Sequence, residues 1–187
     1  MSGVDSTQIV VPSRAFTYVA PVGTAAPADE AATPAAAWIS VGLTTPDSLE
    51  FATEPQFETV NSHQSDYPVR RMQTSDSGTI KVDLQQWNKD NLSFAFGGGE
   101  VTEVTPGHYK FTPPALGARL ERSVLVDWID GTKIYRLVIP RCIQIEGVTT
   151  ALQKGQEARL PLNLAILGGD AVDPWYILSN DTALNPA

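Results

Sequence analysis

The sequence predicts a mainly β fold of the α+β class, a β-sandwich or distorted barrel flanked by one short helix. The first observation is the alternation of apolar and polar residues, which is clearest from Leu160 to Ile166. A period of two is that of a half-buried strand, because successive side chains of a strand point to opposite faces. The second is the recurrence of turn residues at short intervals, which is typical of sandwiches and barrels. The third is that only residues 88–97 carry helix signals.

The length of the chain suits one domain with a substantial core, and we predict a single domain over residues 1–187. Within it, residues 1–15 are expected to form an irregular N-terminal arm and residues 179–187 a C-terminal tail. Residues 21–37 are rich in Ala and Pro, and their prolines exclude a continuous helix. We expect an extended loop there, either flexible or ordered only against a neighbouring subunit.

The chain is predicted to be organised around residues 69–99. A first strand begins at Val69, and the Asp-Ser-Gly sequence at 76–78 supplies the turn chemistry that would end it. A second strand follows at residues 80–84, where apolar and polar residues alternate. The preceding residues 61–68 are polar and rich in turn formers, and we expect a loop there.

A short helix is predicted after the second strand. Asn88 is its expected N-cap, because an Asn side-chain oxygen can accept an otherwise unpaired N–H of the first turn. Asp90 then lies at the positive end of the helix dipole, and Gly97 can adopt the positive φ that ends a helix. The face turned to the sheet would consist of Leu92, Ala95 and Phe96.

Two dipeptides that favour tight turns predict further hairpins. Pro106-Gly107, the pairing that a type II turn prefers, connects two short strands within residues 101–112. Asp130-Gly131 connects two longer strands within residues 124–139, since Asp-Gly is a hairpin signature. Shorter strands are expected at residues 16–20, 38–43, 49–51, 57–60 and 175–178.

Residues 141–149 are predicted to continue as a strand. The alternation in this segment places Ile143 and Ile145 inward, and Gln144 and Glu146 outward. We therefore expect this strand to add one more half-buried member to the sheet.

Composition and charge exclude several classes of function. With 42% hydrophobic and 18% charged residues, the chain is globular rather than disordered. Its net charge of −8 argues against binding nucleic acid through phosphate contacts, which need clustered Lys and Arg. No segment approaches the ~20 apolar residues of a membrane span. Cys142 is the single cysteine, so no internal disulfide can form, and its apolar surroundings predict a buried, inert thiol.

No motif for catalysis is present in the sequence. The two histidines, His63 and His108, lie in turn segments without a nucleophile motif beside them, and we expect both to be solvated. The glycines at 97–99 follow a helix, whereas phosphate-binding loops precede one. We therefore predict no enzyme, no cofactor and no metal. The classes left are a structural protein and an interaction module such as a carbohydrate- or protein-binding β-sandwich, since a hydrolase needs paired carboxylates that the sequence does not show.

Four blocks of sequence, in this order and spacing, carry a resemblance to a known family. They are FTYVAPVGTAAPAD at 16–29, AAWISVGLTTPDSLEF at 36–51, the Gln64-x-x-x-Pro68-Val69-Arg70 string with its hairpin, and NLSFAFGGG at 91–99. With these blocks the chain resembles the major tail tube proteins of long-tailed, siphovirus-like bacteriophages, in particular those of actinobacterial hosts. No single block is diagnostic, and the resemblance covers most of the chain.

The resemblance implies a structural function. Members of that family have a β-sandwich or distorted barrel flanked by a helix, and they form hexameric rings that stack into a hollow tail tube through which the genome leaves. The implied partners are further copies of the chain, the tape measure protein and the tail terminator. The implied location is the tail of the virion, after assembly in the cytoplasm of the bacterial host. Another ring-forming phage protein, such as a tail terminator or head-completion protein, stays an alternative.

The same resemblance gives the irregular segments a role in assembly. The N-terminal arm, the Ala/Pro loop and the loop before Val69 become candidate contacts between subunits. The candidate intersubunit residues are Val11, Pro27, Pro34, Gln64, Pro68, Arg70 and Arg71. Acidic residues on the channel wall would repel DNA, which would pass without specific binding. The candidate lumen-facing acids are Asp83, Asp127 and Glu146, and the alternative for each is an ordinary solvated acid on the outside of the tube.

Overall fold

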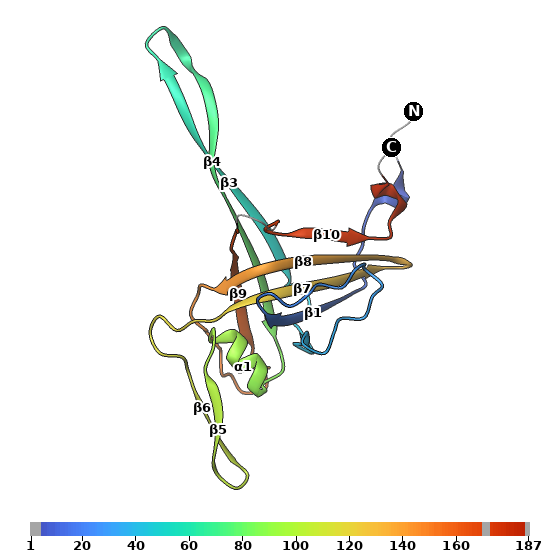
Figure 1. Ribbon diagram of the computed structural model, residues 1–187, viewed down its shortest axis with the longest axis vertical. Helices are drawn as coiled ribbons and strands as arrows, with labels where there is room; N and C mark the ends of the chain where they lie inside the picture. The colour runs from blue at the N-terminus through green and yellow to red at the C-terminus, as the bar shows by residue number, and fades with distance from the viewer. Residues whose placement is uncertain (1–4, 170–172, 186–187) are drawn as a thin grey trace.

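The structure is a computed structural model that describes residues 5–169 and 173–185. Strands make up most of its regular structure, together with one α-helix and two short 3-10 helices (Figure 1). The strands are β1 (Arg14–Pro21), β2 (Ile39–Ser40), β3 (Glu50–Ser62), β4 (Ser65–Leu84), β5 (Glu100–Thr105), β6 (His108–Thr112), β7 (Glu121–Asp130), β8 (Lys133–Gln144), β9 (Leu160–Ile166) and β10 (Tyr176–Ser179). The helices are η1 (Ser6–Gln8), α1 (Lys89–Ala95) and η2 (Thr182–Leu184).

Eight of the strands form one antiparallel sheet, and β5 and β6 form a separate two-stranded sheet. The order in the large sheet is β2-β1-β7-β8-β9-β4-β3, and β10 pairs with β8 outside this path. On one edge of β8, residues 135–138 pair with β10 and residues 142–144 pair with β9. Pro140, which has no N–H to donate, lies between these two segments. β2 and β3, at the ends of the order, do not pair with each other, so the sheet is not a closed barrel.

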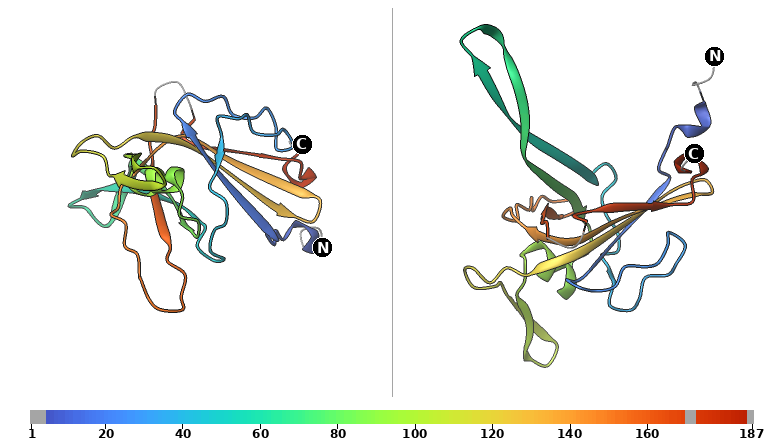
Figure 2. Two further views of the ribbon diagram at one scale, coloured as in Figure 1. Left: turned by 90° about the horizontal axis from the view of Figure 1, so that it is seen from below. Right: turned by 45° about the horizontal axis from the view of Figure 1, so that its top comes forward.

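The core lies between the two halves of this sheet. Side chains from β1, β7 and β8 meet side chains from β4 and β9 in one cluster, to which α1 also contributes. Figure 2 shows the ribbons of these elements from two further directions. Its buried members are Val19, Val41, Ile80, Val82, Leu84, Phe94, Ala95, Val124, Val126, Leu137, Ile139, Cys142, Leu160, Leu162 and Leu164. This arrangement confirms the predicted mainly β, sandwich-like fold with one flanking helix.

The helix α1 forms as its sequence predicts. The side chain of Asn88 accepts a hydrogen bond from the N–H of Asn91 at 2.8 Å, and Asp90 lies in the first turn. Gly97 has a φ of 72°, the left-handed conformation that ends a helix. The residues that contact the core are Phe94 and Ala95, with Leu92 and Phe96 packed beside them.

The turn predicted at 76–78 is wrong. β4 is continuous through these residues, which pair with Thr53–Pro55 of β3. The hairpin turn lies instead at His63-Gln64, so the loop expected there is the tip of one long hairpin. Gly78 serves packing, because a Cβ at this position would lie 2.8 Å from the Cδ1 of Ile166. A glycine that permits close approach has the same sequence signature as a turn glycine.

The orientation predicted for residues 141–149 is also wrong. β8 ends at Gln144, whose side chain is buried, whereas Ile145 is 51% exposed. The alternation changes face at Pro140, opposite an irregular register in β7, and a shift of one residue moves every following side chain to the other face. Gln144 is satisfied in the interior, because its Oε1 accepts the N–H of Asn163 at 2.8 Å.

The two turn dipeptides lie in hairpins. Pro106-Gly107 joins β5 and β6 as predicted, and Gly107 has a φ of 82°. The turn between β7 and β8 lies one residue later than Asp130-Gly131, because Asp130 still pairs with Lys133. Local turn chemistry therefore located both hairpins to within one residue.

Candidate assembly surfaces

The largest unpartnered feature is the outer part of the β3–β4 hairpin. Pairing of β4 with β9 begins at Thr79, and beyond it the two strands pair only with each other among the described residues. We call residues 53–78 the β3–β4 arm, which projects away from the sandwich (Figure 1). All of its residues except Ser62 and Gly78 are exposed. An isolated two-stranded ribbon is marginally stable at best in water, so a partner that packs on the arm would stabilise it.

Apolar side chains on this arm project into solvent. Their exposed fractions range from 41% for Met72 to 81% for Tyr67, and the other members are Phe57, Val60 and Val69. The edges of the arm are protected, because Pro55 and Pro68 each remove one N–H donor and the strand register is irregular at two points. The arm is therefore suited to pack through its faces rather than to accept another strand.

Four of the predicted intersubunit residues lie on the arm. Gln64 is in the turn at its tip, and Pro68 is in β4. Arg70 and Arg71 are consecutive in β4, so their side chains point to opposite faces. All four residues are exposed, and neither arginine forms an ion pair within the described part of the chain. Their role as contacts stays a prediction.

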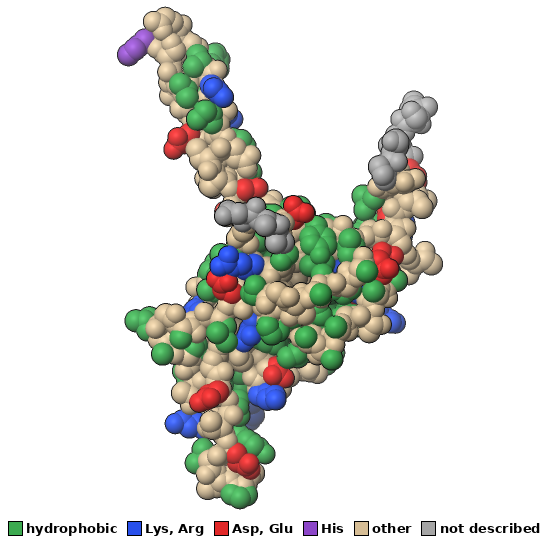
Figure 3. Space-filling view, in the orientation of Figure 1, with side chains coloured by type: hydrophobic (Ala, Val, Ile, Leu, Met, Phe, Trp, Pro, Cys, Tyr) green, Lys and Arg blue, Asp and Glu red, His purple; other side chains and the backbone are tan. Residues whose placement is uncertain are grey.

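A second unpartnered hairpin lies at the opposite end of the molecule. β5 and β6 pair only with each other in residues 5–169 and 173–185, and they project away from the end that carries the arm (Figure 1). Val104 and Tyr109 are 64% and 71% exposed, and Leu116, in the segment that follows, is fully exposed. Hydrophobic side chains are thus presented to solvent at both ends of the long axis (Figure 3).

The Ala/Pro loop at residues 21–37 is held by its own chain. Trp38, directly after the loop, packs with Ala20 of β1 and Leu125 of β7 in a small apolar cluster. The guanidinium of Arg136 donates to two carbonyl groups of the loop, at 2.6 and 2.7 Å, and the indole N–H of Trp38 donates to a third at 3.0 Å. The loop therefore has contacts within its own subunit, and its flexibility or its ordering by a neighbour stays a prediction. Pro27 and Pro34 are half-buried, and a contact role for them stays a prediction.

Asp127 is not an outward carboxylate, which corrects the prediction that it faces a channel. It is buried, and its two oxygens accept hydrogen bonds from the guanidinium of Arg136 at 2.7 and 2.8 Å. These hydrogen bonds raise the pKa of Arg136. Arg136 therefore connects the buried carboxylate to the Ala/Pro loop, and the charge of Asp127 is used inside the subunit.

The other two predicted acids are more accessible. Asp83 is half-buried on β4, and its Oδ2 lies 3.9 Å from the guanidinium of Arg159. Glu146 is exposed just beyond the end of β8. Both side chains are thus at least partly accessible to solvent in the single copy. Their position on a channel wall stays a prediction.

Comparison with known families determines what kind of protein carries these surfaces. A family model described as phage tail tube protein matches residues 2–187. The chain belongs to the phage tail tube protein family. No curated protein matches it. The predicted tail tube family and the predicted structural, non-enzymatic class are therefore confirmed, and this tail tube protein is a component of the phage tail.

Segments near both ends of the described part of the tail tube protein are held at the start of β8, and no sequence signal predicted this contact. The Nζ of Lys133 donates to the carbonyl oxygen of Thr7 at 2.7 Å and pairs with the carboxylate of Asp181 at 2.9 Å. Asp181 also accepts a hydrogen bond from the hydroxyl of Tyr135, which raises the pKa of Tyr135 to about 12. We call these four residues the terminal clasp.

Val11, one of the predicted contact residues, lies in the N-terminal segment that the clasp holds. Its backbone N–H donates to the carboxylate of Asp130 at 3.1 Å, while its side chain is 64% exposed. Ile9 and Val10 beside it are exposed as well. The backbone is therefore fixed while three apolar side chains face solvent, which suits a contact surface.

Replacing Asp181 by Asn will weaken the clasp in a pH-dependent way. Hydrogen bonds, first the one from Tyr135, lower the pKa of Asp181 from 3.8 to about 2, so the folded state favours the ionised carboxylate. Its contribution to stability is fully present above pH 3.8 and is lost as the pH falls through about 2. In urea unfolding, the stability difference between the native chain and Asp181→Asn should shrink over this range. A difference that does not change with pH would contradict this account.

The described residues contain no evident catalytic or metal-binding centre. His63 lies at the tip of the arm and His108 in β6, at opposite ends of the molecule. Within residues 5–169 and 173–185, no group of three potential ligands could hold a metal ion, and no helix is long and apolar enough to cross a membrane. Cys142 is buried as predicted, and desolvation raises the pKa of its thiol to about 12, which makes it unreactive.

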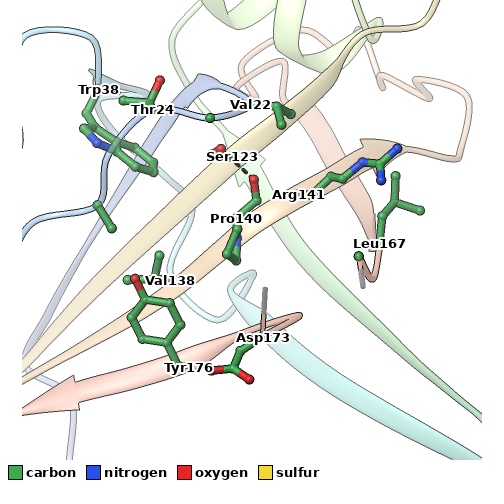
Figure 4. Close-up of a pocket in the computed structure, with 13 residues that line it drawn as sticks. Val22, Thr24, Trp38, Ser123, Val138, Pro140, Arg141, Leu167, Asp173 and Tyr176 are labelled. Atoms are coloured by element: carbon green, nitrogen blue, oxygen red, sulfur yellow. Dashed lines mark hydrogen bonds between the residues drawn. The ribbon is translucent and has the colours of Figure 1, made fainter. Parts of the chain in front are cut away.

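An apolar hollow lies between the start of the Ala/Pro loop and β8 (Figure 4). Its volume is about 500 Å³, and Val22, Trp38 and Val138 contribute to its wall. Arg141 at its rim is already paired with Glu121 at 2.6 Å. The hollow therefore offers apolar surface and no cluster of free charged groups that could act on a substrate.

Proposed function

We propose that this tail tube protein forms hexameric rings that stack into the hollow tail tube of a long-tailed, siphovirus-like phage of an actinobacterial host, and that the genome leaves through this tube. The observation that carries the proposal is the β3–β4 arm, an exposed ribbon that one copy of the chain cannot cover. A protein of the tail tube family with such an arm is suited to find its missing partner in further copies of itself.

Free strand edges support assembly within a ring. Outside the arm, the large sheet ends at β2 and at residues 50–52 of β3, and β10 pairs with β8 on one side. Exposed edges tend to pair with another chain, and a closed ring of copies has no terminal edge. The number of six copies follows from the resemblance to siphovirus-like tube proteins, not from the geometry of a single chain.

The further partners follow from the same resemblance. They are the tape measure protein, which the tube would surround, and the tail terminator, which would close its end, with assembly in the host cytoplasm. A terminator or head-completion ring is the alternative within the same class. The copy number per virion separates the two, because a tube needs many rings and a terminator needs one.

Electron microscopy of the purified chain, combined with sedimentation at increasing concentration, tests the assembly. We expect hollow tubes or stacked rings with sixfold symmetry in cross-section. A chain that stays monomeric at every concentration would overturn the proposal. Rings that never stack would favour the terminator alternative.

Acidic side chains on the channel wall would keep the genome from adhering, because duplex DNA carries about one negative charge per 1.7 Å of its axis. The net charge of −8 agrees with such a wall. Asp83 and Glu146 are the candidates that the structure leaves accessible.

Reversing the charge of both acids should slow ejection. The double variant Asp83→Lys/Glu146→Lys adds two charge units at each position and so changes the net charge from −8 to −4. In phage carrying it, we expect genome release to slow by about tenfold or more at low ionic strength, and less at high salt. The matched control Glu30→Lys/Glu50→Lys makes the same change of net charge elsewhere. Equal release from both double variants would exclude a specific role for Asp83 and Glu146.

A further inference from the structure

The two unpartnered hairpins of the chain are complementary in position. The β3–β4 arm projects from one end of the long axis, and the β5–β6 hairpin projects from the other (Figures 1 and 3). We propose that the arm of one copy docks on the β5–β6 hairpin of a second copy, together with the segment that follows this hairpin. We call residues 100–120 the β5–β6 platform. The proposal rests on the proposed tube function and adds to it the surface that receives the arm.

A contact between the arm of one copy and the platform of another can be repeated from copy to copy, because each copy keeps one free arm or one free platform. When the arm of one copy occupies the platform of a second, the arm of the second copy is still free to engage a third. A contact between two arms would instead be self-complementary and would stop at a pair. Growth along the axis of a tube needs the first kind of contact, and the placement of the arm and the platform at opposite ends provides it.

The apolar chemistry of the two surfaces matches. Tyr67 on the arm and Tyr109 on the platform are 81% and 71% exposed. Each has apolar neighbours that are also exposed, among them Val69 on the arm and Val104 and Leu116 on the platform. Large aromatic side chains of this kind are the usual anchors of protein interfaces, because they bury much area at little entropic cost.

Individual charges on the two surfaces can pair, although the arm as a whole carries more acids (Glu54, Glu58, Asp66 and Asp76) than bases and the platform also carries Lys110 and Arg119. Arg70 and Arg71 are the only Lys or Arg residues of the arm, and they form no ion pair within the described residues. On the platform, β5 carries the exposed acids Glu100 and Glu103, which also form no ion pair in that part of the chain. The Oε1 of Glu103 accepts the N–H of Gly107 at 2.8 Å, which holds this carboxylate near the tip of the hairpin. Contacts of the two arginines with these two acids would favour one register of the docked arm.

Cysteine cross-linking between copies locates the docking site. The double variant Ser65→Cys/His108→Cys, at exposed positions beside Tyr67 and Tyr109 that keep both anchors, is assembled into tubes and treated with a short bismaleimide. The native Cys142 does not compete because it is fully buried. We expect a ladder of dimers, trimers and longer products on a denaturing gel. The matched control Ser65→Cys/Leu152→Cys places the second thiol at an exposed position outside residues 100–120, and we expect no ladder from it. Tubes that give no ladder from Ser65→Cys/His108→Cys, or that give one from the control, would overturn this docking site and leave the tube function intact.

Mixing two defective variants tests the same contact without a cross-link. Tyr67→Ser/Val69→Ser impairs the arm and keeps the platform, whereas Tyr109→Ser/Leu116→Ser impairs the platform and keeps the arm. Neither variant should stack alone. In a mixture, the intact arm of one engages the intact platform of the other, and sedimentation should show discrete pairs of copies or of rings that grow no further. A mixture that stays unpaired, while the native chain forms tubes, would overturn the proposal. A native chain that forms no assembly would overturn the tube function and this inference together.

Discussion

Replacing the β3–β4 arm by a tight turn will abolish tube formation and leave the sandwich folded. Ala52 and Thr79 lie opposite each other in β3 and β4, so an Asn-Gly turn can connect them directly. The arm contributes no residue to the core, and we therefore expect the melting temperature to change by only a few degrees, ~1 kcal/mol or less in stability. Circular dichroism measures the melting, and sedimentation with electron microscopy measures assembly.

The experiment on the armless variant needs one control, and two outcomes would speak against the account. Leu152→Ser is the matched control, since Leu152 is 80% exposed at a position away from the arm, and it should assemble normally. Tubes of ordinary length from the armless variant would contradict the account. An armless variant that unfolds would show that the arm supports its own sandwich rather than a neighbouring copy.

Arg136→Ala will destabilise the subunit by about 3–5 kcal/mol. The substitution leaves the carboxylate of Asp127 buried without a counter-ion and removes both hydrogen bonds from the guanidinium to the Ala/Pro loop. Chemical denaturation should show the loss as a lower midpoint with an unchanged slope. Limited proteolysis should then cut within residues 21–37 faster than in the native chain, where Arg136 holds the carbonyl groups of Asp29 and Ala32.

The exposed pair between Arg141 and Glu121 is the control for this prediction. It has a comparable bidentate geometry, at 2.6 and 2.9 Å, but its side chains are 44% and 35% exposed. Solvent screens such a pair, so Arg141→Ala should cost less than about 1 kcal/mol. Equal losses for the two arginine variants would show that burial of the pair between Arg136 and Asp127 does not matter.

The fold was predictable wherever a local signal determines a local structure. α1 begins after Asn88 and stops before Gly97, as the chemistry of these two residues predicts, and Pro106-Gly107 forms the turn between β5 and β6. It was not predictable where one residue type serves two purposes. Gly78 follows an Asp and a Ser, as a turn glycine would, yet it lies within β4 because Ile166 packs against it. The alternation of apolar and polar residues also gave no sign that the side chains of β8 change face at Pro140.

The assembly surfaces were predictable in place but not in form. The candidates from Gln64 to Arg71 lie on the arm, where a loop was expected. The sequence did not show the arm, because the pairing of β3 with β4 leaves no local signal. Counting outward from the predicted turn at Asp130-Gly131 would have placed Asp127 opposite Ile134, and only the observed turn, one residue later, places it opposite Arg136. By contrast, the contacts of Arg136 with the Ala/Pro loop and of Lys133 with Thr7 connect residues 107 and 126 positions apart. No pattern in the sequence indicates contacts between residues that lie so far apart along the chain.

Hydrogen exchange of the arm amides, compared between the dispersed chain and the assembled tube, tests most directly whether copies of the chain complete one another. Amides of residues 53–78 should exchange rapidly in the single copy, where the ribbon is solvated on both faces, and slowly in the tube. Amides of the sandwich core should be protected equally in both. An arm that exchanges at the same rate in the tube as in the single copy would contradict the account.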